Sequence, residues 1–221
     1  MEEVIQETRA YVSEAVAKVN EEITRTMVRC SYNNDKHEAY SRRLNLSFSG
    51  IPCADAEKNN PSLTADKVVN ELANVNCNIT KDDLSSCYRL YRRNATNAAP
   101  PLILATFVSQ KVRDKVLSYS SQYKDKDSGK YINEDMTNLQ RKLFSYLRSK
   151  DEVVIKKTVS FKDGHIICLL KKNEERTRGW SRVHTALDLA ELDENLAVDF
   201  TDEDTMESLG LKEYFVNINI T

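Results

Sequence analysis

Apolar residues near the start of the chain recur with the three- and four-residue spacing of a heptad pattern. They are Ile5, Val12, Val16, Val19 and Ile23, and neither proline nor glycine precedes Gly50. This spacing is typical of a coiled-coil seam, so we predict one helix over residues 1–44. Its d positions are Ile5, Val12, Val19, Thr26, Asn33 and Tyr40, and its a positions are Arg9, Val16, Ile23, Cys30, His37 and Leu44.

The seam changes character along this helix, because it is apolar up to Ile23 and polar from Thr26 to His37. An isolated helix of this kind is marginally stable in water, so it needs something to pack against. Valine and isoleucine at both a and d positions favour three strands over two. We therefore predict that residues 1–41 form a parallel homotrimer through the five apolar seam residues. The alternative is a single amphipathic helix that docks on its own domain.

Residues 42–136 alternate between strand and helix patterns. Leu44, Leu46 and Phe48 alternate with polar residues at the period of a half-buried strand. The later elements are a helix from Pro61, strands near 86–91 and 102–108, a helix capped by Ser109 and a strand at 129–133. This order is the layout of RNA-recognition-motif (RRM) folds, so we predict an RRM-like βαββαβ domain.

Residues 137–192 are expected to form a small α+β domain, which makes α+β the fold class of the whole chain. Thr137 is placed to cap a helix, and Asp163-Gly164 favours a type I′ turn between strands at 153–162 and 165–172. That register places on the core side Val159, Phe161, Ile166, Cys168 and Leu170. A further helix is predicted over 182–191, and residues 193–221 are expected to be an acidic tail.

The net charge of −2 conceals an uneven distribution. Residues 1–28 hold six acidic and three basic side chains, and residues 186–221 hold ten acidic and one basic. Residues 29–185 therefore hold 28 basic and 18 acidic side chains, a balance of +10. A basic middle of this kind favours nucleic-acid binding, with an ordinary solvated surface as the alternative. The acidic tail, with Asp202, Glu203 and Asp204 at its centre, is a candidate competitor of nucleic acid, with a solubilising or partner-binding appendage as the alternative.

Several protein classes are disfavoured by the sequence. No apolar run approaches the roughly 20 residues of a membrane span, and the acidic N-terminus does not look like a secretory signal. The five cysteines are scattered, so we expect reduced thiols, a cytoplasmic or nuclear protein and no metal site. Without a glycine-rich phosphate loop or a nucleophile triad, we expect no enzyme, cofactor or small-molecule substrate. The acidic residues Glu134 and Asp135 precede a predicted helix and are expected to favour its N-terminus.

Four short blocks of sequence resemble those of a known family. They run from Ser41 to Pro52, from Cys87 to Arg93, from Pro101 to Phe107 and from Tyr131 to Thr137. In order and spacing they resemble the RNA-binding core of LINE-type retrotransposon first-open-reading-frame proteins. The few-polyhedra (FP) proteins of baculoviruses share part of the pattern. The resemblance implies a coiled-coil trimer that holds single-stranded RNA in a basic cleft between the RRM-like and C-terminal domains.

Candidate RNA ligands come from two sources. The resemblance implies phosphate contacts from Arg43, Asn45, Arg92, Arg93 and Arg141, whereas Ser47 stands where the family has an arginine. The hairpin pattern adds lysines on its outer face, namely Lys156, Lys162 and Lys171. The predicted register makes Lys156 and Lys171 cross-strand neighbours, a like-charge pair that an anion would relieve. Aromatic candidates for base stacking are Tyr88, Tyr91, Tyr119 and Tyr123.

Two hypotheses follow from these patterns. The first is a non-enzymatic, homotrimeric protein that binds single-stranded RNA, or alternatively DNA, and forms ribonucleoprotein, with nucleic-acid chaperone activity as a further expectation. The second is an FP-like or domesticated scaffold protein that acts through protein–protein contacts.

Overall fold

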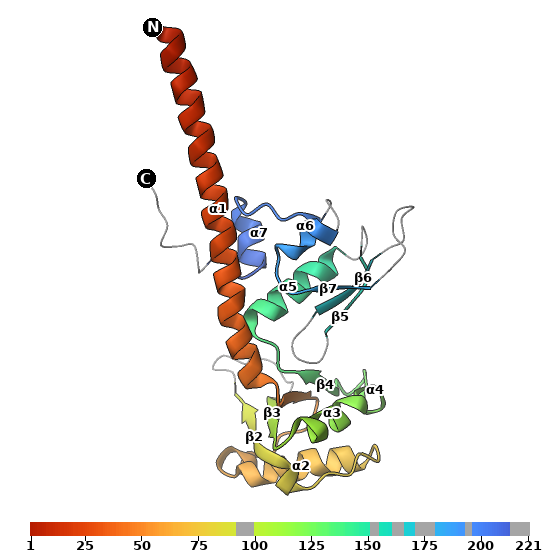
Figure 1. The fold of residues 1–221 in the computed structure, drawn as a ribbon. Helices are drawn as coiled ribbons and strands as arrows, with labels where there is room; N and C mark the ends of the chain where they lie inside the picture. The colour runs from red at the N-terminus through yellow and green to blue at the C-terminus, as the bar shows by residue number, and fades with distance from the viewer. Residues whose placement is uncertain (92–99, 151–154, 161–165, 171–179, 193–195, 213–221) are drawn as a thin grey trace. The chain divides into compact units, whose positions relative to one another are not determined.

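A computed structural model describes residues 1–91, 100–150, 155–160, 166–170, 180–192 and 196–212 (Figure 1). The chain mixes helices with antiparallel sheets and divides into two compact units. Unit 1 joins residues 1–39 to residues 137–221, and unit 2 is formed by residues 40–136.

Helix α1 spans Glu2–Arg42, close to the predicted limits of 1–44. Acidic residues Glu2 and Glu3 lie in its first turn and Arg42 lies in its last turn, which complements the helix dipole at both ends. The side chains of residues 1–22 are all exposed, whereas Val28, Ser31, Tyr32 and Asp35 are buried. Residues 1–16 of α1 are therefore uncovered by the described chain, whereas Ala17, Asn20 and Glu21 line a hollow together with residues 186–201.

Unit 2 contains a four-stranded antiparallel sheet with the strand order β2-β3-β1-β4. Its strands are β1 (Asn45–Ser49), β2 (Leu84–Leu90), β3 (Leu102–Phe107) and β4 (Tyr131–Glu134). Its helices are η1 (Asp55–Asn59), α2 (Pro61–Ala73), η2 (Lys81–Asp83), α3 (Gln110–Ser118) and α4 (Ser120–Tyr123). Each strand and helix expected from the periodicity of residues 42–136 thus has a counterpart, with ends shifted by one to three residues.

Local chemistry accounts for how these helices start. The Asn60 side chain accepts a hydrogen bond from the Ser62 amide and Pro61 occupies the first turn of α2, while Ser109 caps α3 as predicted. The core of unit 2 lies between the helices and one face of the sheet, and its largest buried residues include Leu46, Phe48, Leu72, Ile103 and Phe107.

A buried ion pair fixes the segment between β1 and α2. The Arg89 Nε atom donates to the Glu57 carboxylate at 2.8 Å, and both side chains are 1% exposed. The Arg89 guanidinium also donates to the carbonyls of Ile51, Pro52 and Pro101, and Lys67 pairs with Glu57. Burial alone would raise the pKa of Glu57, but the hydrogen bonds from Arg89, Lys67 and their neighbours outweigh it and lower the pKa to about 2.

This pKa predicts how the stability of unit 2 responds to acid. Because the pKa of folded Glu57 is about 2 rather than the ordinary 4.5, its contribution is present above about pH 4.5 and is lost as the pH falls towards 2. We expect Glu57→Gln to flatten this part of the stability curve, measured by urea unfolding between pH 6 and pH 2. The matched control is Glu14→Gln, since Glu14 forms an exposed pair with Lys18. If the wild type, Glu57→Gln and Glu14→Gln showed the same pH dependence of unfolding, the lowered pKa of Glu57 would be contradicted.

Unit 1 contains a three-stranded antiparallel sheet with the order β5-β6-β7. Helix α5, which Thr137 caps as predicted with Gln140 completing a capping box, contacts β5, β6 and α7. The bounds are α5 (Asn138–Ser149), β5 (Ile155–Ser160), β6 (Ile166–Leu170), β7 (Trp180–Val183), α6 (Asp188–Leu192) and α7 (Glu203–Ser208). The core combines Val28 and Tyr32 of α1 with Leu143 of α5 and Ile166 of β6.

The predicted hairpin register is wrong by one residue. Val159 pairs with Ile167, and Ser160 pairs with Ile166, whereas a two-residue turn at Asp163-Gly164 would pair Val159 with Cys168. A register irregularity between Ile155 and Lys157 shifts the pairing once more. The burial of Ile166, Cys168 and Leu170 on one face of β6 is confirmed.

The helix predicted over 182–191 is also wrong in its first half. Residues 180–183 form β7, which pairs with β6 and buries Val183. The Asp188 carboxylate then accepts hydrogen bonds from the amides of His184 and Thr185, and this turn delays the start of α6 to Asp188.

The segment expected to be an acidic tail contributes to the core of unit 1. Leu196, Met206, Leu209 and Leu211 are each at most 5% exposed and belong to the same cluster as Leu143. The acidic side chains Asp202, Glu203 and Asp204 remain exposed on α7 or just before it. The described part of this segment is therefore a packed element with a charged outer face.

Candidate nucleic-acid interface

One face of the unit 2 sheet lies away from the helices of that unit. Leu46 and Phe48 of β1 point to the side where α2 and α3 contribute Val68, Leu72 and Val116 to the core. Alternation along each strand sends the intervening side chains to the opposite face. We call this opposite face the open face, and its residues are Ser47, Tyr88, Leu90, Leu102, Leu104, Tyr131 and Asn133.

The strand register places the apolar residues of the open face together. Tyr88 lies opposite Leu104 and Leu90 lies opposite Leu102 on the neighbouring strands β2 and β3. Tyr88 is 42% exposed and Leu90 is 40% exposed, although both belong to a regular strand. These two exposed side chains and the two half-buried leucines beside them form a patch that can stack on a flat, apolar ligand.

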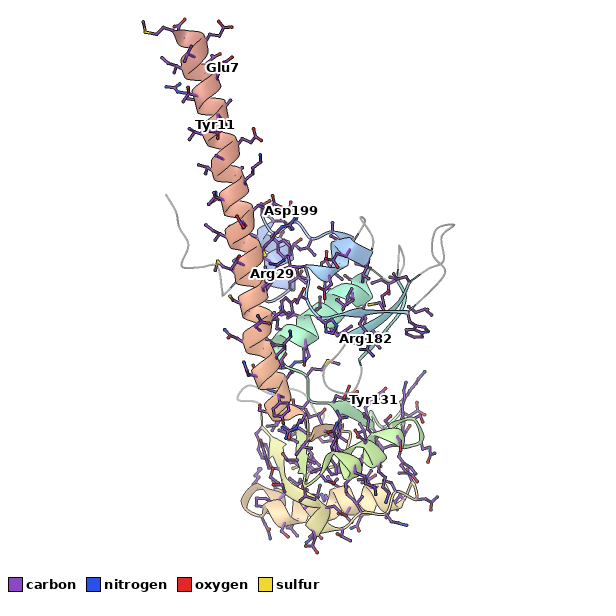
Figure 2. The ribbon with its side chains drawn as sticks, in the orientation of Figure 1. Glu7, Tyr11, Arg29, Tyr131, Arg182 and Asp199 are labelled. Atoms are coloured by element: carbon purple, nitrogen blue, oxygen red, sulfur yellow. The ribbon has the colours of Figure 1, made fainter. Side chains whose placement is uncertain are left out.

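The β4 edge of the open face combines an aromatic ring with a cation. Tyr131 pairs with Ser49 on β1, and the Lys124 ammonium lies 5.7 Å from the centroid of its ring (Tyr131 is labelled in Figure 2). A cation over an aromatic ring offers both a stacking surface and a positive charge for a phosphate.

Arg43 lies at the junction of α1 and β1, where its guanidinium stacks on Tyr40. Its central carbon is 3.8 Å from the Tyr40 ring centroid, and Nη1 donates to the Tyr40 carbonyl at 2.8 Å. The Tyr40 side chain is 66% exposed, and Arg43 is half-buried. The pair therefore presents a preformed planar cation at the surface of unit 2.

Asn45 is engaged by two neighbours. Its Oδ1 accepts from the Thr106 hydroxyl at 2.9 Å, and its Nδ2 donates to the Asp135 carboxylate at 3.0 Å. Asp135 also accepts from Arg42 at 3.0 Å. These hydrogen bonds position the start of β1. Both ends of the Asn45 side-chain amide thus have partners within unit 2 in this structure.

The acidic residues before α5 form ion pairs instead of acting only at that helix terminus. Asp135 pairs with Arg42, and Glu134 pairs with the buried Arg113 of α3. Sequence reasoning missed both pairs, since the partners lie 93 and 21 residues apart along the chain and no local pattern links them.

The remaining predicted ligands divide into two groups. Arg141 is exposed on α5, and Lys156 lies in β5, where the structure describes its backbone only. Arg92, Arg93, Lys162 and Lys171 lie outside the described residues. The expected pairing of Lys156 with Lys171 is wrong, because Lys156 lies at the register irregularity between Ile155, which pairs with Leu170, and Lys157, which pairs with Leu169.

The tyrosine candidates separate by exposure. Tyr88 and Tyr91 are exposed, whereas Tyr123 is buried with its ring edge-on to Phe48 at 6.1 Å, and Tyr119 packs against the same core. Burial raises the pKa of Tyr123, as expected for a packing residue. Stacking candidates are therefore Tyr88, Tyr91 and Tyr131, the last of which was not singled out from the sequence.

The predicted oligomerisation residues lie on the uncovered half of α1. Ile5, Val12, Val16 and Val19 are between 48% and 54% exposed, while Ile23 is half-buried. Glu7 and Tyr11 mark this stretch of α1 in Figure 2. A row of four exposed aliphatic residues at heptad spacing offers a surface for further copies of the helix.

The described residues contain no cluster of three side chains that could hold a metal ion within one chain. Among them, no helix combines the length and apolar character needed to cross a membrane. No protein-family profile matches the chain, and no curated protein matches it significantly.

Proposed function

We propose that this protein binds single-stranded nucleic acid, primarily RNA, as a homotrimer assembled through α1. Unit 2 supplies the binding surface in this proposal, and its element order and sheet order support an RRM-like assignment. The observation that carries the proposal is the open face, where exposed Tyr88 and Leu90 lie beside Leu102 and Leu104. Bases stack on such faces, while arginines and lysines at the margin hold phosphates.

The open face differs in one respect from the usual RRM surface. Stacking aromatics normally lie on the two central strands, but here the open-face residues of β1 and β3 include Ser47 and Leu104. The aromatic groups lie on the edge strands instead, with Tyr88 on β2 and Tyr131 on β4. This arrangement favours two separate stacking positions and little sequence preference.

Replacing the two edge tyrosines tests the proposal directly. Each base stacked on an aromatic ring contributes about 1–3 kcal/mol, so we expect Tyr88→Ala and Tyr131→Ala each to weaken RNA binding by about 10-fold to 100-fold. Filter binding to labelled single-stranded RNA at two salt concentrations measures the effect. Tyr11→Ala is the control, because Tyr11 is 74% exposed on α1 and lies off the seam. Unchanged affinity in both sheet variants would exclude the open face as the binding surface.

A scaffold role through protein contacts is the second candidate, favoured by a hollow in unit 1. The hollow has a volume of about 640 Å³ and lies between residues 17–29 of α1 and residues 186–191 and 197–201. Leu187, Val198 and Phe200 contribute to its lining, and apolar hollows of this size accept side chains of a partner. Absence of RNA binding by the assembled protein at both salt concentrations would favour this role.

A further inference from the structure

Helix α1 has two opposite faces over its C-terminal half. The face that packs on unit 1 consists of Val28, Ser31, Tyr32 and Asp35. The polar seam residues Thr26, Cys30, Asn33 and His37 each lie two positions from one of these, and two positions correspond to about 200° around a helix. All four seam residues are exposed. The described chain therefore covers one face of α1 and leaves the seam accessible as far as His37.

If copies of α1 associate along the seam, the exposed polar side chains of Thr26, Cys30, Asn33 and His37 lie at the contact between the helices. In a parallel assembly, side chains at one a position come from every copy and form a layer around the common axis. Burying imidazoles there without partners would be costly, so a polar layer calls for a ligand or a hydrogen-bond partner. His37 occupies an a position, and three copies would bring three imidazoles into one layer.

We propose that the His37 layer binds one divalent transition-metal ion, with one imidazole from each of three copies. The site needs the trimer of the proposed function, because a single chain contributes one ligand. Imidazole nitrogens suit zinc, nickel and copper, and three histidines with a water complete a tetrahedral zinc site.

Asn33 is placed to orient these ligands. It lies one turn before His37 on the same face, and its Oδ1 accepts only a long contact of 3.4 Å from Lys36 among the described side-chain bonds. In the assembled site the Asn33 carbonyl accepts the Nδ1–H of His37, which leaves Nε2 for the metal. Outer hydrogen bonds of this kind fix the tautomer of metal-bound histidines, so Asn33 is a positioning residue.

Metal titration of the full-length, chelator-treated protein tests the site. We expect isothermal titration with Ni²⁺ or Zn²⁺ to show one ion per three chains, and His37→Ala to abolish that binding while light scattering still shows the trimer mass. His184→Ala is the matched control, because His184 is exposed near β7 in unit 1 and should leave the binding unchanged. Asn33→Ala should weaken the affinity by about 10-fold to 100-fold at unchanged stoichiometry.

Disulfide cross-linking of Cys30 tests the assembly of α1 independently of metal binding. Cys30 lies one heptad before His37 and is exposed, and Cys53 is the other exposed cysteine of the described residues. In a Cys53→Ser background, diamide should oxidise pairs of Cys30 thiols to disulfides between copies, giving covalent dimers on denaturing gels. A cross-linked trimer that binds no metal overturns the metal site alone. Metal binding that survives His37→Ala also overturns it, while a monomeric protein without cross-links overturns the trimer of the proposed function.

Discussion

Replacing Val12 and Val19 by aspartate should convert the assembled protein to monomers. Light scattering should then fall from about three times the chain mass of 25.3 kDa to that mass itself. Both residues are d positions and more than half exposed in the chain, so the change removes nothing from the core of unit 1. In an assembly every copy would bury unpaired carboxylates, each costing several kcal/mol.

The control for this experiment is Tyr11→Asp, which adds an acid to the same stretch of helix away from the seam. Tyr11 is more exposed than either valine, at 74%, and its variant should keep the oligomer mass. Circular dichroism should show a loss of helix in the valine variant alone, because residues 1–16 are exposed and uncovered by their own chain. A wild-type protein that is monomeric at tens of micromolar would refute the assembly.

Truncation after Asp193 should unfold unit 1 instead of releasing an inhibitory tail. It removes Leu196, Met206, Leu209 and Leu211, which are at most 5% exposed. At about 1.5–3 kcal/mol for each buried side chain, the loss of about 6–12 kcal/mol matches the whole stability of a typical domain. Limited proteolysis should degrade residues 137–193 of the truncated chain and spare unit 2. A truncated protein as resistant as the full chain would contradict the packing of this segment.

A variant that keeps unit 1 folded is needed to test whether the acidic residues at the start of α7 compete with RNA. Asp202→Asn, Glu203→Gln and Asp204→Asn together remove three exposed charges, and asparagine at position 202 preserves the cap that Asp202 provides for α7. If the acidic face competes with RNA, short RNA should bind this variant more tightly at low salt, with a smaller gain at high salt. The control neutralises Glu2, Glu3 and Glu7 on the uncovered half of α1.

Local periodicity was sufficient to predict most helices and strands of this chain. The heptad spacing predicted α1, and the caps at Ser109 and Thr137 marked the starts of α3 and α5. The residues that carry each signal lie close together along the chain, so these elements can be predicted without knowledge of tertiary contacts. The long N-terminal helix and the mixture of helix and sheet were therefore accessible from sequence.

Long-range pairing set the features that the sequence did not reveal. The segment 196–211 looked like a tail because acidic residues cluster at its centre and its apolar residues are irregularly spaced, so their burial depends on the core of unit 1. The short strand β7 exists because β6 offers it a partner. Similarly, the ion pair of Glu57 with Arg89 joins residues 32 positions apart, and no pattern in either neighbourhood indicates it.

The candidate site was predicted in part. The burial of Phe107 followed from strand alternation and is confirmed. Strand alternation also placed Ser47 on the face opposite Leu46 and Phe48, but Ser47 is only 8% exposed and is therefore not an outward group. The engagement of Asn45 by Asp135 and Thr106 did not follow, since it depends on the neighbours that β3 and β4 supply. Tyr131 was overlooked because its role depends on the cross-strand position that the sheet gives it and on the nearby Lys124.

The division of the chain has a consequence for the order of events on the ribosome. Unit 2 is one continuous stretch, whereas unit 1 combines residues 1–39 with residues 137–221. Unit 2 can therefore fold as soon as residue 136 has left the ribosome. Val28 and Tyr32 cannot be buried at that stage, because the core residues that cover them are synthesised more than a hundred residues later. During that interval α1 is available on both faces. Neighbouring nascent chains on one messenger can thus pair their helices before either chain completes its own core.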